Sequence, residues 1–146
     1  MSSKKIIPIY DLYKKLESDK RFEFNKLEES YTPYDAASPH RHNYFEVLYF
    51  NESGGKHEID FNSFSIEANS IHFISPEQVH LLRRENHVTG YVLSFTKEFF
   101  NEENALTAII ESLPFFDNPS ALPLVRIKDL NVQKELSDTF LKIQSE

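Results

Sequence analysis

The stretch PHRHNYFE, at residues 39–46, decides the fold and contains the first candidate site residues. His40, His42 and Glu46 are all even-numbered, and successive side chains alternate between the two faces of an extended strand. These three side chains are therefore expected to point to the same side. The later stretch PEQVH, at residues 76–80, adds His80 from a second strand. Three imidazoles and one carboxylate facing one interior would form either a metal site or the polar floor of a ligand pocket.

Short alternating runs of apolar and polar residues surround this stretch at a spacing of about ten residues. Strands are predicted at residues 21–28, 42–50, 56–61, 64–66, 71–75, 79–84 and 88–95, with a further candidate at 122–127. In the run at 56–61, alternation predicts that His57, Ile59 and Phe61 point inward. Gly54 and Gly55 supply a turn in which positive φ is accessible. This pattern is typical of a β-sandwich or β-barrel.

Two helices are predicted after the strands. The first spans about 97–113, with Thr96 as its N-cap and Pro114 at its end. The second, at 129–146, is amphipathic and carries an apolar stripe of Val132, Leu136, Phe140 and Ile143. Such a stripe can join two protomers or pack on its own barrel, and we predict that it forms a homodimer. The expected organisation is an N-terminal arm at 1–20, a barrel at 21–128 that includes the first helix, and this final helix.

Composition excludes several classes of function. At 146 residues the chain is expected to be one domain. It contains no cysteine, and it has neither a signal sequence nor an apolar run long enough for a membrane helix, so a cytoplasmic protein without membrane contact is expected. Its net charge of −7 argues against DNA binding by these residues. Three glycines form no phosphate-binding loop, and no nucleophile motif is present.

The motifs resemble those of a known superfamily. His40-x-His42-x3-Glu46, the glycine turn and Pro76-x3-His80 resemble the two cupin motifs. Together with residues 39–50, 70–80 and 90–100, they make residues 20–113 similar to the N-terminal domain of AraC-type transcription regulators. The chain departs from the cupin pattern where Glu77 follows Pro76, where Asn69 replaces a turn glycine, and where the proline-to-histidine spacing is one residue shorter than in the metal enzymes of the superfamily.

The resemblance implies a mainly β fold. The expected architecture is a cupin-like antiparallel β-barrel, also called a double-stranded β-helix or jelly roll, followed by two C-terminal helices. It also implies binding of a small-molecule effector, such as a sugar, and coupling to DNA through a bacterial helix-turn-helix domain. That domain is absent from this chain, whose last residues interrupt a helical pattern and therefore suggest truncation.

Three interpretations of the site remain open. In the first, a non-enzymatic sensor without a cofactor binds its effector through His40, His42, Tyr44, Glu46, His80, Tyr91 and Phe95. In the second, a metal-dependent cupin enzyme, such as a dioxygenase or isomerase, binds a divalent transition metal through His40, His42, Glu46 and His80. In the third, the polar cluster is a remnant of barrel architecture in which His42 and Glu46 satisfy each other, as would suit a standalone dimerising module. Outside the cluster, His57 is expected to line the barrel or its core, His72 to be packed or at the surface, and His87 to be solvated.

Overall fold

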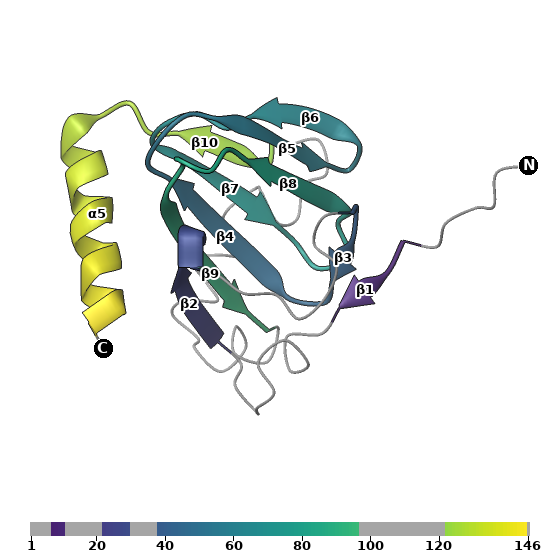
Figure 1. The fold of residues 1–146 in the computed structure, drawn as a ribbon. Helices are drawn as coiled ribbons and strands as arrows, with labels where there is room; N and C mark the ends of the chain where they lie inside the picture. The colour runs from purple at the N-terminus through teal and green to yellow at the C-terminus, as the bar shows by residue number, and fades with distance from the viewer. Residues whose placement is uncertain (1–6, 11–21, 30–37, 97–121, 146) are drawn as a thin grey trace, which may run out of the picture.

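The computed structural model describes residues 7–10, 22–29, 38–96 and 122–145, whose regular structure is mainly antiparallel β-strand (Figure 1). The strands are β1 (Ile9–Tyr10), β2 (Phe22–Lys26), β3 (Arg41–His42), β4 (Phe45–Phe50), β5 (Gly55–Ile59), β6 (Asn62–Ser65), β7 (Ser70–Ile74), β8 (His80–Arg84), β9 (Gly90–Phe95) and β10 (Leu124–Arg126). A 3-10 turn, η1 (Leu27–Glu29), and a helix, α5 (Leu130–Ser145), complete the described elements. The mainly β prediction is therefore confirmed.

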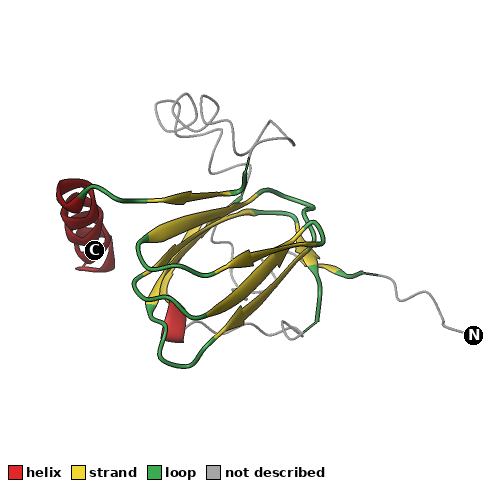
Figure 2. Cartoon of the chain, turned by 90° about the horizontal axis from the view of Figure 1, so that it is seen from above, coloured by secondary structure: helices red, strands yellow, loops and turns green. Residues whose placement is uncertain are grey.

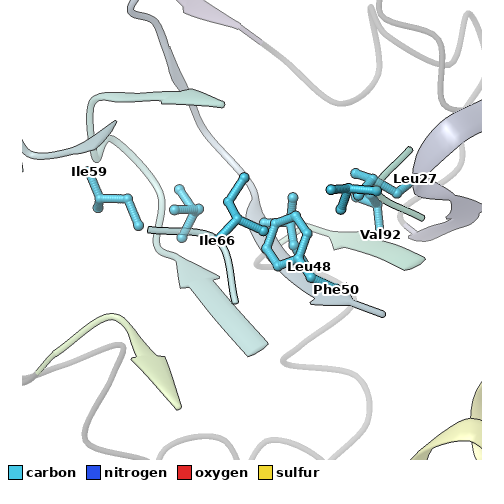
Figure 3. Close-up of a cluster of buried hydrophobic side chains, with 8 residues drawn as sticks. Leu27, Leu48, Phe50, Ile59, Ile66 and Val92 are labelled. Carbon is cyan, nitrogen blue, oxygen red and sulfur yellow. The ribbon is translucent and has the colours of Figure 1, made fainter. Parts of the chain in front are cut away.

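Two antiparallel sheets face each other across one apolar core. The larger sheet has the order β10-β7-β4-β9-β2, and the smaller has the order β6-β5-β8. One buried cluster joins them, because it combines Leu48 and Val92 of the larger sheet with Ile59 of the smaller one (Figure 3). Ile66 and Val88, from the turns between strands, belong to the same cluster. The core therefore lies between the layers, as in a β-sandwich.

The predicted closed barrel is not formed by the described residues. Between the strand that begins near Arg41 and the smaller sheet, the pairing consists of one bridge, in which the backbone N–H groups of His40 and His80 each donate to the other's carbonyl oxygen at 3.1 and 2.9 Å. A bend at Asn43 and Tyr44 then separates β3 from β4, and β4 turns into the larger sheet. Because the bend ends this pairing after one residue pair, no continuous ladder of backbone hydrogen bonds joins the two sheets within the described residues.

The turn between β5 and β6 corrects one inward prediction. Asp60 and Phe61 both have positive φ, at 48° and 68°, and Phe61 is 78% exposed. The inward alternation of β5 therefore includes His57 and Ile59 but not Phe61, because the chain reverses direction at Asp60 and Phe61. Asn69 also adopts positive φ, at 59°, which confirms that asparagine replaces a turn glycine there without obstruction.

The C-terminal helix begins at a capped N-terminus. The Asp129 carboxylate accepts hydrogen bonds from the backbone N–H groups of Asn131 and Val132, at 2.8 and 3.3 Å. The helix lies against the β2 side of the larger sheet (Figures 1 and 2). The helix predicted at 97–113 lies outside the described residues. No helix in the described ranges is both long and apolar enough to span a membrane.

Four residues of the predicted N-terminal arm are described. Ile9 and Tyr10 pair in parallel with Arg41 and His42, and the Arg41 backbone N–H donates to the Pro8 carbonyl oxygen at 2.8 Å. The Arg41 guanidinium also donates to the Ile7 carbonyl oxygen at 3.1 Å. This part of the arm is therefore held as an added edge strand beside the segment that carries His40 and His42.

Candidate functional site

The four motif residues come together in the interior, as the sequence predicted. His42 ends β3, Glu46 lies in β4 and His80 begins β8, while His40 is held beside His80 by their backbone bridge. All four side chains are buried. The ring centroid of His80 lies 4.6 Å from that of His40 and 4.9 Å from that of His42. Nε2 of His42 lies 3.9 Å from Oε2 of Glu46.

Backbone carbonyls fix the tautomers of two of these histidines. Nδ1 of His40 lies 2.9 Å from the Ser38 carbonyl oxygen, and Nδ1 of His42 lies 2.8 Å from the Tyr44 carbonyl oxygen. Because a carbonyl oxygen only accepts, each Nδ1 must carry the hydrogen and donate it. In the neutral ring, Nε2 is then a lone-pair acceptor. On His42 this acceptor faces the Glu46 carboxylate, which is an arrangement suited to a hydroxyl donor or a cation.

Two further histidines extend the cluster, and sequence reasoning did not connect them to it. His57 on β5 and His72 on β7 are fully buried, and their Nδ1 atoms lie 2.8 Å apart. Nε2 of His57 lies 3.0 Å from Nδ1 of His80. Alternation correctly predicted that His57 points inward, and the burial pattern of β7 follows the same period of two. Their contact depends on how the two sheets face each other, which strand periodicity does not encode.

These linked imidazoles are neutral at pH 7. Burial, together with the neighbouring imidazoles, lowers the pKa of His57 well below its ordinary value. Burial lowers the pKa of His72 to about 4. Burial also lowers the pKa of His80 to about 3, although the Glu46 carboxylate opposes this shift. Neutral imidazoles can accept a hydrogen bond or coordinate a metal ion.

The predicted aromatic contacts divide between the two faces of the larger sheet. The Tyr44 ring is buried and stacks on His42 with centroids 3.9 Å apart, so it adjoins the cluster. Tyr91 and Phe95 are not brought to it. Tyr91 stacks with Phe24 at 5.5 Å, and Phe95 stacks with Phe45 at 5.2 Å. Both belong to the odd-numbered face of β9, whereas its buried residues facing the core are even-numbered.

The predicted dimerisation stripe lies partly against its own sheet. Phe140 is 9% exposed, and its ring lies 4.9–6.1 Å from the rings of Phe24, Tyr49 and Tyr91. Leu136 and Ile143 are half-buried, and Val132 is exposed. His87, predicted to be solvated, is exposed. Homodimerisation through this stripe stays a prediction.

The chain is similar to several solved structures. They include ToxT from Vibrio cholerae, at 14% identity and a TM-score of 0.46 over 83% of this chain and 48% of that one. ToxT bound to (E)-4-(8-methylnaphthalen-1-yl)but-3-enoic acid has 13% identity, a TM-score of 0.48 and coverage of 85% and 49%. Oxalate decarboxylase from Bacillus subtilis, described with Mn(II) centres, has 13% identity, a TM-score of 0.33 and coverage of 68% and 32%. The chain thus spans about half the length of the ToxT chains.

No curated protein matches the chain in sequence. A protein-family model does match it, over residues 27–145, which include every residue of the candidate site, the smaller sheet and all of the larger sheet except β2. Its description agrees with the resemblance that the motifs indicate and with a polar cluster enclosed between two sheets. The chain therefore belongs to the AraC-like ligand binding domain family.

Proposed function

We propose that this chain is the small-molecule-sensing and dimerisation domain of an AraC-type transcription regulator, acting in the cytoplasm and coupled to DNA through a separate helix-turn-helix domain. Family membership supports ligand binding in preference to catalysis. The observation that carries the proposal is the buried convergence of His40, His42, Glu46 and His80 from three separate segments. A buried polar group without a partner is costly, and a bound polar molecule would supply one to Nε2 of His80, which is buried and has none among the described residues.

The chemistry of the cluster favours a neutral, hydroxyl-rich effector such as a sugar. Lone pairs on Nε2 of His40 and His42 accept hydrogen bonds, and the Glu46 carboxylate accepts further ones. Hydroxyl groups donate to such acceptors and accept in turn from N–H groups. An anionic effector would meet the Glu46 charge at close range in a medium of low dielectric constant.

Thermal-shift and calorimetric measurements with a panel of neutral pentoses, hexoses and polyols test this proposal. A compound that stabilises the wild-type chain should lose this effect in Glu46→Gln, which removes the charge and one acceptor oxygen. The matched control is Glu85→Gln, because Glu85 is exposed and lies outside the cluster. Equal stabilisation of the wild type and Glu46→Gln would place the binding site elsewhere.

A metal-dependent cupin enzyme is a second candidate, and one observation specifically favours it. His42, Glu46 and His80 each offer a donor atom, and these atoms lie within 4.8 Å of one another. Donors around a tetrahedral ion are about 3.4 Å apart, so the side chains would have to close by roughly 1 Å. The imidazoles and the carboxylate are donor types that fit a divalent transition metal, with His40 as a further ligand. A metal ion bound there would supply Lewis-acid chemistry.

Elemental analysis of protein purified without chelator or affinity tag separates the two candidates. Stoichiometric iron, manganese, nickel or zinc that disappears in His42→Ala and persists in His87→Ala would favour the enzyme. His87 is the matched control because it is exposed and lies outside the cluster. Protein without metal that still binds a small molecule through Glu46 would favour the sensor.

Exposed apolar residues on α5 support the dimerisation part of the proposal. Leu130, Val132 and Leu141 are 78%, 38% and 55% exposed. Sedimentation velocity over a range of concentrations should show a dimer that Val132→Asp weakens. The control Thr139→Asp introduces the same charge at an exposed, polar position of the helix. Equal sedimentation of both variants and the wild type would argue against a seam at Val132.

A further inference from the structure

Three imidazoles form a continuous hydrogen-bonded chain inside the sandwich. His57 is the central member, with Nδ1 2.8 Å from Nδ1 of His72 and Nε2 3.0 Å from Nδ1 of His80. The chain connects the two sheets, since His57 and His80 lie on β5 and β8 and His72 lies on β7. At its two ends, Nε2 of His72 and Nε2 of His80 are buried and have no hydrogen-bond partner within the described part of the molecule.

Proton counting allows this chain only two arrangements. A neutral imidazole carries one N–H, and each hydrogen bond needs one hydrogen between its two nitrogens. If His57 donates from Nδ1, it accepts at Nε2 from Nδ1–H of His80, which leaves Nε2 of His80 bare and places a hydrogen on Nε2 of His72. If His57 donates from Nε2, both ends reverse. His72 and His80 must therefore always hold opposite tautomers.

We propose that His57 and His72 are positioning residues that fix the tautomer of His80, so that a ligand bound at His80 changes the tautomer of His72 on the opposite sheet. This inference rests on the proposed binding site at His80 and extends it to two residues outside the motif. All three rings are buried, and burial disfavours the charged form of an imidazole, which agrees with the neutral rings that the proton count requires. Each arrangement presents a different chemistry to the ligand: a bare nitrogen for a cation or hydroxyl donor, or an N–H for an acceptor oxygen.

Glu46 selects the arrangement of the unliganded protein. Its carboxylate and a ring nitrogen of His80 lie within 4.8 Å of each other, and Nδ1 of His80 is engaged by His57. The negative charge favours a hydrogen on Nε2 of His80, and His72 then carries its hydrogen on Nδ1. A cation that binds Nε2 of His80 needs that nitrogen without a hydrogen, so both hydrogen bonds of the histidine series reverse their direction. Nδ1–H of the ligated His80 then donates to His57, which holds the ring in place.

The far end of the chain lies beside the strand that leads to the helix. His72 is directly paired with Leu124 of β10, and β10 is followed along the sequence by α5. A change of tautomer at His72 therefore occurs beside β10, the strand that leads along the chain into the candidate dimerisation helix. The series of His72, His57 and His80 has two discrete tautomeric states, and a contact at either end can favour one of them. This is the physical requirement for coupling between sites.

Side-chain ¹⁵N–¹H correlation spectra of the histidine-labelled 146-residue chain at pH 7 test the proposal, because protonated and bare ring nitrogens resonate separately. In the unliganded wild type, His72 should show Nδ1–H and His80 should show Nε2–H. Addition of Zn²⁺ alone should convert His80 to Nδ1–H and His72 to Nε2–H, while the exposed His87 supplies an internal reference. In His57→Phe, Zn²⁺ should still change His80 and should leave His72 unchanged. His57→Gln, which keeps a donor and an acceptor, should restore the response of His72.

Equal tautomers at His72 and His80 in the unliganded wild type would overturn the proposal. A response of His80 to Zn²⁺ without one at His72 would do the same, and so would an unchanged His72 response in His57→Phe. If Zn²⁺ changes neither ring, the metal interpretation of the site fails. The tautomers of the unliganded protein then decide the inference: opposite tautomers at His72 and His80 support it, and equal tautomers overturn it. If His57→Phe does not fold, as judged by amide dispersion, the wild-type and His57→Gln spectra provide the decision.

Discussion

Phe140→Ala is expected to destabilise the domain by about 3 kcal/mol, because Phe140 attaches α5 to the larger sheet. Truncation of a buried phenylalanine costs about 3–5 kcal/mol, and each aromatic pair adds about 0.5–1.5 kcal/mol beyond the buried area. Phe140 is 9% exposed and contacts three aromatic rings of the sheet. It lies between one helix and one sheet, so the site can partly close, and the lower end of the range applies.

Urea unfolding measures this loss directly. With an m-value of about 1.5–3 kcal/mol/M, the midpoint should fall by about 1–2 M. Leu141→Ala is the matched control, because Leu141 is the next residue of the same helix and is 55% exposed. Its midpoint should change by an amount equivalent to less than about 0.5 kcal/mol. Similar losses in the two variants would refute the packing argument. A Phe140→Ala loss that appears only at high protein concentration would assign Phe140 to a seam between protomers instead.

Three other predictions follow from strain and burial. Because the pKa of His72 is lowered to about 4 in the folded state, its contribution to stability is complete above pH 6.5 and is lost as the pH falls toward 4. By pH 5 the loss from His72 alone is about 2 kcal/mol, and His57 and His80, whose pKa values burial also lowers, add to it. Urea unfolding measures the total loss, and His87→Ala should leave the slope unchanged. A flat profile from pH 7.5 to 5 would contradict this. Gly90→Ala should cost about 3 kcal/mol or prevent folding, since a Cβ there would lie 1.8 Å from the Tyr49 carbonyl oxygen; a native melting temperature would show that the strands can separate. Phe61→Gly should stabilise the chain by about 1 kcal/mol because it relieves positive φ at an exposed turn, and a lower melting temperature would assign Phe61 a packing role.

Local periodicity was sufficient to predict the strands and the four motif residues. Alternation within residues 39–46 placed His42 and Glu46 on one side, and the structure buries both together. The final helix was equally accessible, because the spacing of its apolar residues is a local property. Strand closure was not accessible, because it depends on where the bend at Asn43 and Tyr44 redirects the chain.

The two faces of β9 explain why Tyr91 and Phe95 were predicted to line the site although they do not adjoin the histidine cluster. The strand reads GYVLSF, and it is apolar on both faces apart from Ser94. Alternation then gives no sign of which face meets the core. The register with β4 supplies the answer, because Tyr91 pairs with Tyr49 and Phe95 pairs with Phe45, on the face opposite Glu46. Register of this kind is set by long-range pairing and cannot be read from one strand.

The buried histidine chain is itself an argument for function. Apolar side chains at the positions of His57, His72 and His80 together would fill the same interior and leave none of these buried ring nitrogens without a partner. Such an unpaired buried group costs about 1–3 kcal/mol, whereas apolar replacement of both members of a hydrogen-bonded pair can be neutral or stabilising. Folding alone therefore does not require three imidazoles in series between the sheets. Their presence is explained if the polar cluster at His80 must be held in a defined proton state, and that requirement arises only when the cluster binds something.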